Sequence, residues 1–282
     1  MNLHILKNQS FCQGVTKALD IVTKASTNKE LPHPLYLLGN LIHNKNIDAY
    51  IASLGIIQLK GTSRLQMLEA IEEGTVIFTA HGVSNKVRER ALEKKLTIID
   101  ATCPVVKKSE DMMKKYANDG YTILFIAKPS HPEALTVIDD IENSYIINPE
   151  NIIIPHNLKN VAINHQTTMS GYDINYIYEL IKQEYPEAIK LKVLCNITEL
   201  RQKEIYDLEV AENSLIIVIG DILSNNSTKL YEQARRKTNA IFIETAKDLD
   251  LDSIKQYDDI YIASGTSTPR IVIDEVIEKI KK

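Results

Sequence analysis

Three cysteines have the types and spacing that could do chemistry. Cys12, Cys103 and Cys195 lie 91 and 92 residues apart in a chain of 282 residues. A structural zinc site usually shows paired ligands such as C-x-x-C, and this sequence has no such pair. A single thiol nucleophile with a histidine base would leave the other two cysteines unexplained. A 4Fe–4S cluster is normally held by four thiolates, so three would leave one iron open to a substrate oxygen.

A simpler interpretation of the cysteines stays open at this point. Free cysteine is among the most buried residue types, so the three could be unrelated core residues. Only three occur, which excludes a disulfide framework as the basis of the fold.

Imidazole, hydroxyl, amide and carboxyl side chains follow six of the apolar runs in the sequence. These residues are His43, His81, His131, Glu133, Thr167, Thr168, Ser224, Asn226, Ser227 and Ser267. Each alone is also typical of an ordinary loop or helix cap. Because ligands bind beyond the carboxyl ends of parallel strands, their repetition there indicates a site for an anionic group such as a diphosphate.

The apolar runs that must position these residues are continuous, as expected of strands buried on both faces. They cover residues 35–40, 75–80, 96–100, 121–127, 161–165, 191–195, 214–220, 240–244 and 260–264. Amphipathic stretches between them predict helices over 14–25, 45–53, 65–73, 84–94, 105–118, 173–184, 199–210, 227–236 and 270–281. This alternation predicts an α/β fold with mainly parallel sheets.

The near-equal cysteine spacing predicts three similar α/β modules, each contributing one cysteine to a shared centre. Their expected bounds are 13–102, 103–194 and 195–282, with residues 1–12 packing on the third. The length also favours several subdomains over one core.

Charge and hydropathy exclude several classes of protein. The net charge is −4 and no basic block occurs, which argues against a nucleic-acid-binding protein. No apolar run approaches the roughly 20 residues of a membrane helix, and the first residues lack a signal-peptide pattern. A cytoplasmic protein without membrane contact is therefore expected.

Nine short motifs, in order from residue 10 to residue 269, resemble the 4-hydroxy-3-methylbut-2-enyl diphosphate reductase family. They are SFCQGV, LIHN, HGVS, DATCPVV, HPE, QTT, LCNIT with RQ, SNNS and GTSTP. DATCP, HGVS and HPE are each moderately specific, whereas all nine in order are very specific. The family catalyses the last step of the non-mevalonate isoprenoid pathway.

The resemblance implies three α/β modules in a pseudo-threefold arrangement around a central iron–sulfur cluster. Cys12, Cys103 and Cys195 would hold a 4Fe–4S cluster with one open iron site. His43, His81 and His131 would line the pocket, and Ser224, Asn226 and Ser267 would bind the diphosphate. Glu133 would deliver protons and Thr167 would orient the substrate hydroxyl, with His131 also in the catalytic group.

The implied reaction removes the allylic hydroxyl with two electrons and protons, giving isopentenyl and dimethylallyl diphosphate. A ferredoxin or flavodoxin would supply the electrons. The alternative on the same scaffold is a non-redox iron–sulfur hydratase or a cluster-based sensor. A further alternative is an α/β binding module with buried cysteines.

The sequence departs from the family pattern at four points. Ser10 stands where a glycine is expected, and Ile197 replaces a small residue before Thr198. Asn225 replaces a second serine, and Asp221 adds a carboxylate that is expected to point away from the diphosphate. These differences concern substrate affinity more than cluster binding.

Overall fold

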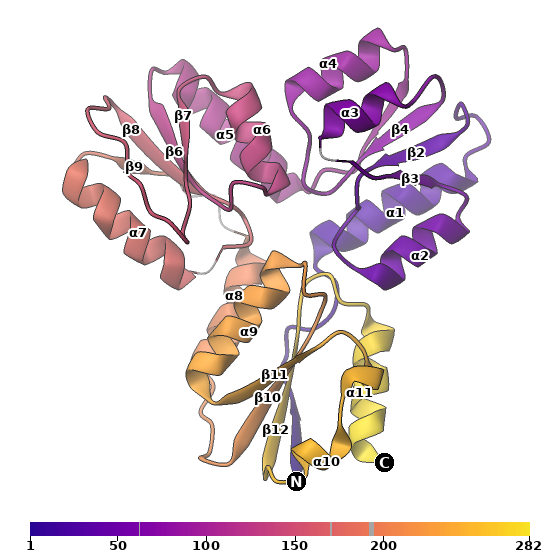
Figure 1. The fold of residues 1–282 in the computed structure, drawn as a ribbon, viewed down its shortest axis with the longest axis vertical. Coiled ribbons are helices and arrows are strands. Elements are labelled where there is room, and N and C mark those ends of the chain that lie inside the picture. Colours follow the sequence, from indigo (N-terminus) through magenta and orange to yellow (C-terminus); the bar gives the residue numbers. More distant parts are fainter. Residues whose placement is uncertain (62, 170, 192–194) are drawn as a thin grey trace. The chain divides into compact units, whose positions relative to one another are not determined.

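Three parallel four-stranded sheets organise the part of the chain that the computed structural model describes, residues 1–61, 63–169, 171–191 and 195–282. Helices cover both faces of each sheet (Figure 1). The chain divides into two compact units. The first unit comprises Met1–Thr16, Ile42–Asn46 and Cys195–Lys282, and the second comprises Lys17–Leu41 and Ile47–Leu194.

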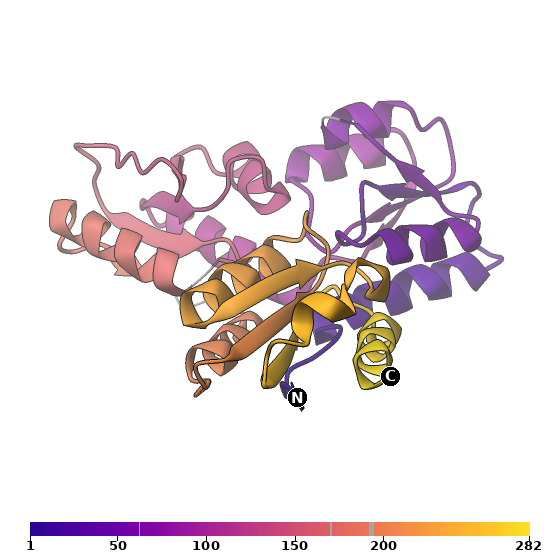
Figure 2. The same cartoon turned by 60° about the horizontal axis from the view of Figure 1, so that its bottom comes forward.

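The first unit contains one sheet of strand order β1-β12-β10-β11. Its strands are β1 (Asn2–Ile5), β10 (Ser214–Ile219), β11 (Asn239–Ile243) and β12 (Asp259–Ser264). Its helices are α8 (Asn196–Tyr206), α9 (Asn225–Lys237), α10 (Leu251–Ile254) and α11 (Arg270–Lys281), with a 3-10 turn over Ala246–Asp248. Figure 2 shows the same sheet between its helices from a second direction.

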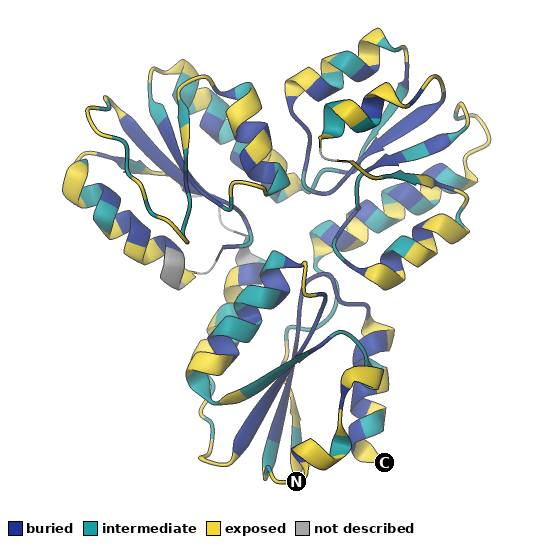
Figure 3. Cartoon of the chain, viewed as in Figure 1, coloured by how far each residue is buried: buried dark blue, intermediate teal, exposed yellow. Residues whose placement is uncertain are grey.

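Strand β10 explains why the apolar runs of the sequence are continuous. Ile217 packs into a cluster with residues of α11, whereas Ile216 and Val218 pack with residues of α8 and α9. Successive side chains of a strand point to opposite faces, so a strand covered on both sides needs apolar residues at every position. The central strands of the sheets are accordingly buried, and many exposed residues lie along the outer faces of the helices (Figure 3). These buried strands include β10, β4 (Thr75–Phe78), β6 (Thr122–Ile126) and β8 (Val161–His165).

The second unit contains two sheets, of strand order β3-β2-β4-β5 and β7-β6-β8-β9. The first comprises β2 (Leu35–Leu38), β3 (Ile57–Leu59), β4 (Thr75–Phe78) and β5 (Thr97–Asp100). The second comprises β6 (Thr122–Ile126), β7 (Ser144–Ile147), β8 (Val161–His165) and β9 (Ile189–Lys190). The helices are α3 (Arg64–Glu69), α4 (Asn85–Glu93), α5 (Pro104–Asn118), α6 (Pro132–Asp140) and α7 (Gly171–Glu184). Helices α1 (Gln13–Thr27) and α2 (Lys45–Ser53) begin in the first unit and continue into the second.

The parallel registers place the polar loops at common sheet edges. Ile219 pairs with Ser264, so the loops after β10 and β12 leave the sheet side by side. In the second unit Phe78 pairs with Asp100, and Ile126 pairs with His165. Each of these edges is therefore built as the sequence predicts, from the carboxyl ends of neighbouring strands.

The predicted fold class is confirmed: the chain has three similar α/β modules with parallel sheets. The module bounds given above and the arrangement around a central cluster stay predictions. No helix among the described residues is long and apolar enough to cross a membrane.

The predicted strand over 191–195 falls mainly on residues 192–194, which lie outside the described residues. Among the described residues, strand β9 covers Ile189–Lys190, and the Leu191 N–H bonds the carbonyl of Ile163. Cys195 is the N-cap of helix α8.

Candidate active site

Two of the three cysteines lie in the first unit, each directly before a helix. The Val15 N–H donates to Cys12 Sγ at 3.4 Å, and the Cys12 N–H bonds the Thr266 carbonyl at 3.2 Å. Burial raises the pKa of the Cys12 thiol, and the neighbouring Cys195 thiol raises it further. The two sulfurs are therefore electrostatic neighbours in a partly buried setting.

A cradle of small polar side chains lies at the sheet edge after β10 and β12. Ser224 caps helix α9 by accepting from the Ser227 N–H, and Ser267 Oγ donates to Ser224 Oγ at 3.2 Å. Asn226 is 2% exposed, and neither polar atom of its side-chain amide has a hydrogen-bond partner among the described residues. A buried unpaired amide at a helix N-terminus is suited to an anionic ligand.

Two glycines leave the space in which this cradle forms. A Cβ added at Gly265 would lie 2.0 Å from Ser227 Oγ, and one added at Gly220 would lie 2.4 Å from the same atom. Ser227 is fully buried between them. Neither glycine can therefore be replaced without moving Ser227 and the first turn of α9.

The LIHN segment reaches the same loops through Asn44. The Asn44 amide donates to the Ser267 carbonyl at 3.0 Å, and its oxygen accepts from the Asn46 N–H. The neighbouring His43 is thereby held in the same unit as Ser224, Asn226 and Ser267. Asp221 is buried and accepts from the Leu223 N–H, so its carboxylate turns into its own loop.

In the second unit, Cys103 adjoins the loop that carries His81. Cys103 is the N-cap of α5, and its N–H bonds the carbonyl of Ala80, the residue before His81. Gly82 has a φ of +75°, a left-handed conformation that suits glycine at this turn. The strand pairing of β4 with β5 thus brings two predicted site residues to one edge.

Glu133 and Thr167 form the tightest contact of this unit. The Thr167 N–H donates to Glu133 Oε2 at 2.9 Å, and the Thr167 hydroxyl bonds Oε1 at 2.7 Å. Glu133 is 3% exposed, although a glutamate in the first turn of a helix commonly faces solvent. Burial raises the pKa of Glu133 to about 7, while the two bonds from Thr167 act in the opposite direction. The carboxyl group can therefore hold a proton near neutral pH.

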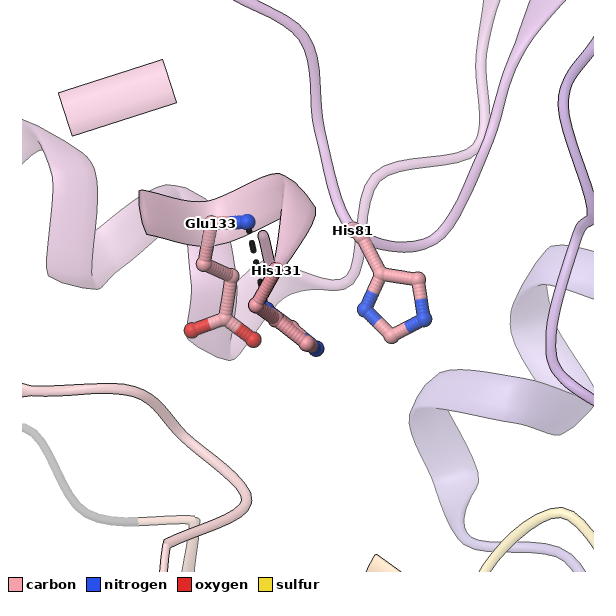
Figure 4. A group of neighbouring side chains, drawn as sticks. All are labelled: His81, His131 and Glu133. Atoms are coloured by element: carbon pink, nitrogen blue, oxygen red, sulfur yellow. Dashed lines mark hydrogen bonds between the residues drawn. The ribbon is translucent and has the colours of Figure 1, made fainter. Parts of the chain in front are cut away.

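His131 and His81 stand beside this acid (Figure 4). The Glu133 N–H donates to His131 Nδ1 at 3.3 Å, so a neutral His131 carries its proton on Nε2. The rings of His81 and His131 meet edge to face with centroids 5.1 Å apart. His131 is thus set to donate a hydrogen bond from Nε2.

The same three side chains could in principle hold a metal ion, since their possible ligand atoms all lie within 4.8 Å of one another. However, the Nδ1 lone pair of His131 already accepts from Glu133, and its Nε2 carries the proton. A neutral imidazole binds a metal through an unprotonated nitrogen. The group is therefore better suited to proton transfer and hydrogen bonding than to a resident metal.

A second buried carboxyl lies behind the His81 loop and was not expected from the sequence. A Cβ at Gly82 would lie 2.8 Å from Glu110 Oε1, and that oxygen is buried without a partner among the described residues. Burial raises the pKa of Glu110 to about 8, and Lys114 opposes this shift. Glu110 therefore keeps its proton at neutral pH and places no full charge near Glu133.

The structure groups the predicted site residues by unit. Cys12, Cys195, His43, Ser224, Asn226 and Ser267 lie in the first, and Cys103, His81, His131, Glu133 and Thr167 in the second. Sequence reasoning missed Asn44, Glu110 and Arg201. Asn44 and Arg201 lie within the family motifs LIHN and NITELRQ, and this position is the sequence feature that could have identified them.

Each unit thus carries polar side chains at the carboxyl ends of its parallel strands, a buried acid beside two imidazoles in one and a hydroxyl and amide cradle in the other, which is typical of an α/β enzyme. The chain belongs to the LytB protein family, whose model matches residues 3–281.

Relatives of known name agree. A protein of Geobacillus thermodenitrificans called 4-hydroxy-3-methylbut-2-enyl diphosphate reductase is 39% identical, covering 96% of this chain and 87% of its own. One of the same name from Macrococcus caseolyticus is 38% identical, covering 97% and 87%. The solved structure of the E-1-hydroxy-2-methyl-but-2-enyl-4-diphosphate reductase of Plasmodium falciparum matches with a TM-score of 0.87 at 27% identity, covering 100% of this chain and 88% of that one. A second structure, described as the terminal enzyme of the non-mevalonate pathway, matches with a TM-score of 0.68 at 26% identity, covering 100% and 99%.

Proposed function

We propose that this chain reduces (E)-4-hydroxy-3-methylbut-2-enyl diphosphate to isopentenyl diphosphate and dimethylallyl diphosphate. The allylic C–O bond breaks, two electrons and two protons are consumed, and the hydroxyl leaves as water. The names of the relatives support this reaction, and so does their coverage of nearly the whole chain.

The observation that carries the proposal is the buried Glu133 carboxyl held by Thr167. Hydroxide is a poor leaving group, so its departure needs a proton donor at the oxygen. Glu133 supplies that proton because burial keeps it protonated near neutral pH. Thr167 fixes the direction of the carboxyl through both of its oxygens and orients the substrate hydroxyl.

The diphosphate binds in the cradle of the first unit. Ser224, Ser267 and the Asn226 amide donate hydrogen bonds to its oxygens, and the N-terminus of α9 adds oriented N–H groups. The family resemblance assigns His43, His81 and His131 to the lining of the same pocket, and the tautomer of His131 lets it donate from Nε2. Hydrogen bonds from neutral groups leave the diphosphate charge uncancelled, so binding depends on the number of donors.

Cys12, Cys103 and Cys195 would each give one thiolate to a 4Fe–4S cluster. None of the three forms a disulfide, and each stands directly before a helix whose N–H groups favour an anionic sulfur. Three soft thiolate donors without a fourth fit an iron–sulfur cluster better than a closed zinc site. Such a cluster would pass electrons from the donor to the substrate one at a time, and its iron without a protein thiolate would supply Lewis acidity.

The alternative functions, a non-redox hydratase or a cluster-based sensor, have less support than the reductase. A non-redox hydratase or a sensor is not favoured, because the matching relatives are named reductases. The module bounds 13–102, 103–194 and 195–282, the ferredoxin- or flavodoxin-type donor and the cytoplasmic location stay predictions of the sequence.

The test is purification without air, followed by iron and sulfide analysis and addition of the substrate to protein reduced with a coloured dye. We expect a brown protein with about four irons and four sulfides per chain. The reduced dye should be oxidised only when the substrate is present. A colourless, iron-free protein after reconstitution with iron and sulfide would contradict the proposal.

A further inference from the structure

Arg201 is a buried cation in the first unit that the reaction above does not use. It lies on helix α8 and is 4% exposed. Its Nη1 donates to the Ser264 carbonyl at 2.7 Å, and its Nη2 donates to the Ser10 carbonyl. These carbonyls belong to the end of β12 and to the loop before Cys12. Arg201 therefore ties the Cys12 loop to the strand that leads into Gly265 and Ser267.

The Ser10 loop is held from both sides. Ser10 has a φ of +65°, and its N–H donates to Ser264 Oγ at 2.9 Å while its carbonyl accepts from Arg201. This conformation suits the glycine that the family pattern leads one to expect there. The two bonds hold Ser10 in the left-handed region, and with it the approach of the chain to Cys12.

The charge of Arg201 interacts with both cysteines of the first unit. Within the described part of the chain, Arg201 forms no ion pair with a carboxylate. Burial lowers the pKa of Arg201 to about 10, and the neighbouring Cys12, Glu204 and Cys195 act in the opposite direction. Glu204 is already occupied, since its carboxylate accepts from the backbone N–H groups of Lys7 and Asn8. Among the described residues, Glu204 bonds Lys7 and Asn8 and not Arg201, so the two cysteines are the other charged or polarisable groups near the guanidinium.

The Nε donor of the guanidinium is unused. Arg201 Nε is buried and has no hydrogen-bond partner among the described residues, although both Nη atoms are paired. A buried charged N–H without an acceptor is costly and calls for a partner. An acceptor that the thiols of Cys12 and Cys195 hold in place would satisfy it.

We propose that Arg201 Nε donates a hydrogen bond to a sulfur of the iron–sulfur cluster, on the side held by Cys12 and Cys195, and so raises the reduction potential of the cluster. This inference rests on the proposed function. Hydrogen bonds to sulfur and nearby charge set the potentials of such clusters, because both stabilise the more negative, reduced form. Arg201 is a positioning and tuning residue, and it takes no part in the bond-breaking step.

Three variants separate the effects of charge, hydrogen bonding and loop support. Arg201→Lys keeps the charge but lacks the Nε donor and the fork to two carbonyls. Arg201→Met removes both the charge and the donors at similar length. Arg270→Met is the matched control, because Arg270 is a surface arginine of α11 paired with Asp274.

The measurement is the midpoint potential of the cluster after anaerobic reconstitution, detected by electron paramagnetic resonance. The iron content of each protein is the second readout. We expect a shift to more negative potential in Arg201→Lys, a larger shift in Arg201→Met and none in Arg270→Met. Unchanged potentials in both Arg201 variants with a full complement of iron would overturn the proposal. If both Arg201 variants lost the cluster while Arg270→Met kept it, the proposal would be overturned in favour of a purely structural role of Arg201. Absence of a cluster from the unaltered protein would contradict the proposed function instead.

Discussion

Thr167 bonds both carboxylate oxygens of Glu133, through its N–H at 2.9 Å and its hydroxyl at 2.7 Å. The pair joins the start of α6 to the end of β8, two segments 34 residues apart in sequence. Both residues are buried, so the contact fixes an acid where solvent cannot reorient it.

Replacing Glu133 with glutamine tests its role as the proton donor. The amide keeps the shape and can still accept from Thr167, but it cannot deliver a proton. We expect Glu133→Gln to retain its iron and lose turnover by about 10²–10⁴-fold, the usual contribution of general acid catalysis. The measurement is the rate of substrate-dependent dye oxidation at equal iron content. An enzyme of full speed would rule out this role.

The pH dependence of turnover should follow the Glu133 carboxyl. The proton is present below the pKa of about 7 and lost above it, so turnover falls as pH rises through 7. Thr167→Val removes a hydrogen bond that lowers this pKa, and the falling limb should then move to higher pH. Thr167→Ser keeps the hydroxyl and serves as control. If turnover fell at the same pH in the unaltered protein, Thr167→Val and Thr167→Ser, a group other than Glu133 would set the pH dependence.

Glu110 should make folding stability depend on pH. Its pKa is about 8 in the folded protein against 4.5 ordinarily, so the folded state binds the proton more tightly. Stability is then lost as pH rises from about 4.5 to 8. The charged groups around Glu110 are Arg64, Asp111, Lys114, Glu133 and Asp140.

Glu110→Gln removes this dependence, so its melting temperature should exceed that of the unaltered protein at pH 8, by a margin that shrinks towards pH 5. Asp111→Asn, an exposed neighbour on the same helix, is the control. Thermal unfolding at several pH values measures the difference in melting temperature between each variant and the unaltered protein. A margin that does not vary with pH would mean that Glu110 titrates normally.

Gly265 should be required for diphosphate binding. In Gly265→Ala the new Cβ would stand 2.0 Å from Ser227 Oγ, so Ser227 and the first turn of α9 must shift. We expect KM for the substrate to rise about tenfold or more, equivalent to losing one or two hydrogen bonds to a charged group. Gly171→Ala is the control, since a Cβ there meets nothing within 4 Å. Equal KM values in the two variants would show that the cradle lies elsewhere.

The strands could be predicted from the sequence where they are buried on both faces. Runs such as TVIF in β4 and LIIVI in β10 are apolar throughout because each residue meets a helix layer. Strands β1, β3 and β7 were missed, since they lie at sheet edges and are partly exposed. Helix α6 was also absent from the predicted helices, although the HPE motif forms its N-cap and first turn.

The site could be predicted only as far as its residues follow strand ends. Glu133 and Thr167 do so, and the structure brings them into contact, whereas their roles in the reaction are proposals. Asn44 and Arg201 could not be found in this way, because they act through carbonyls 223 and 191 residues away in sequence. Glu110 was hidden by its position on a helix whose neighbours Lys107, Lys108 and Asp111 are exposed. Its burial depends on how close the Gly82 turn lies.

The central claim is a two-electron reduction of an allylic diphosphate, and counting electrons tests it most directly. Chemically reduced protein, prepared without air, is titrated with the substrate while dye oxidation and products are followed together. The account predicts two electrons consumed for each substrate, with isopentenyl and dimethylallyl diphosphate as products. A hydrated product formed without oxidation of the dye would contradict it.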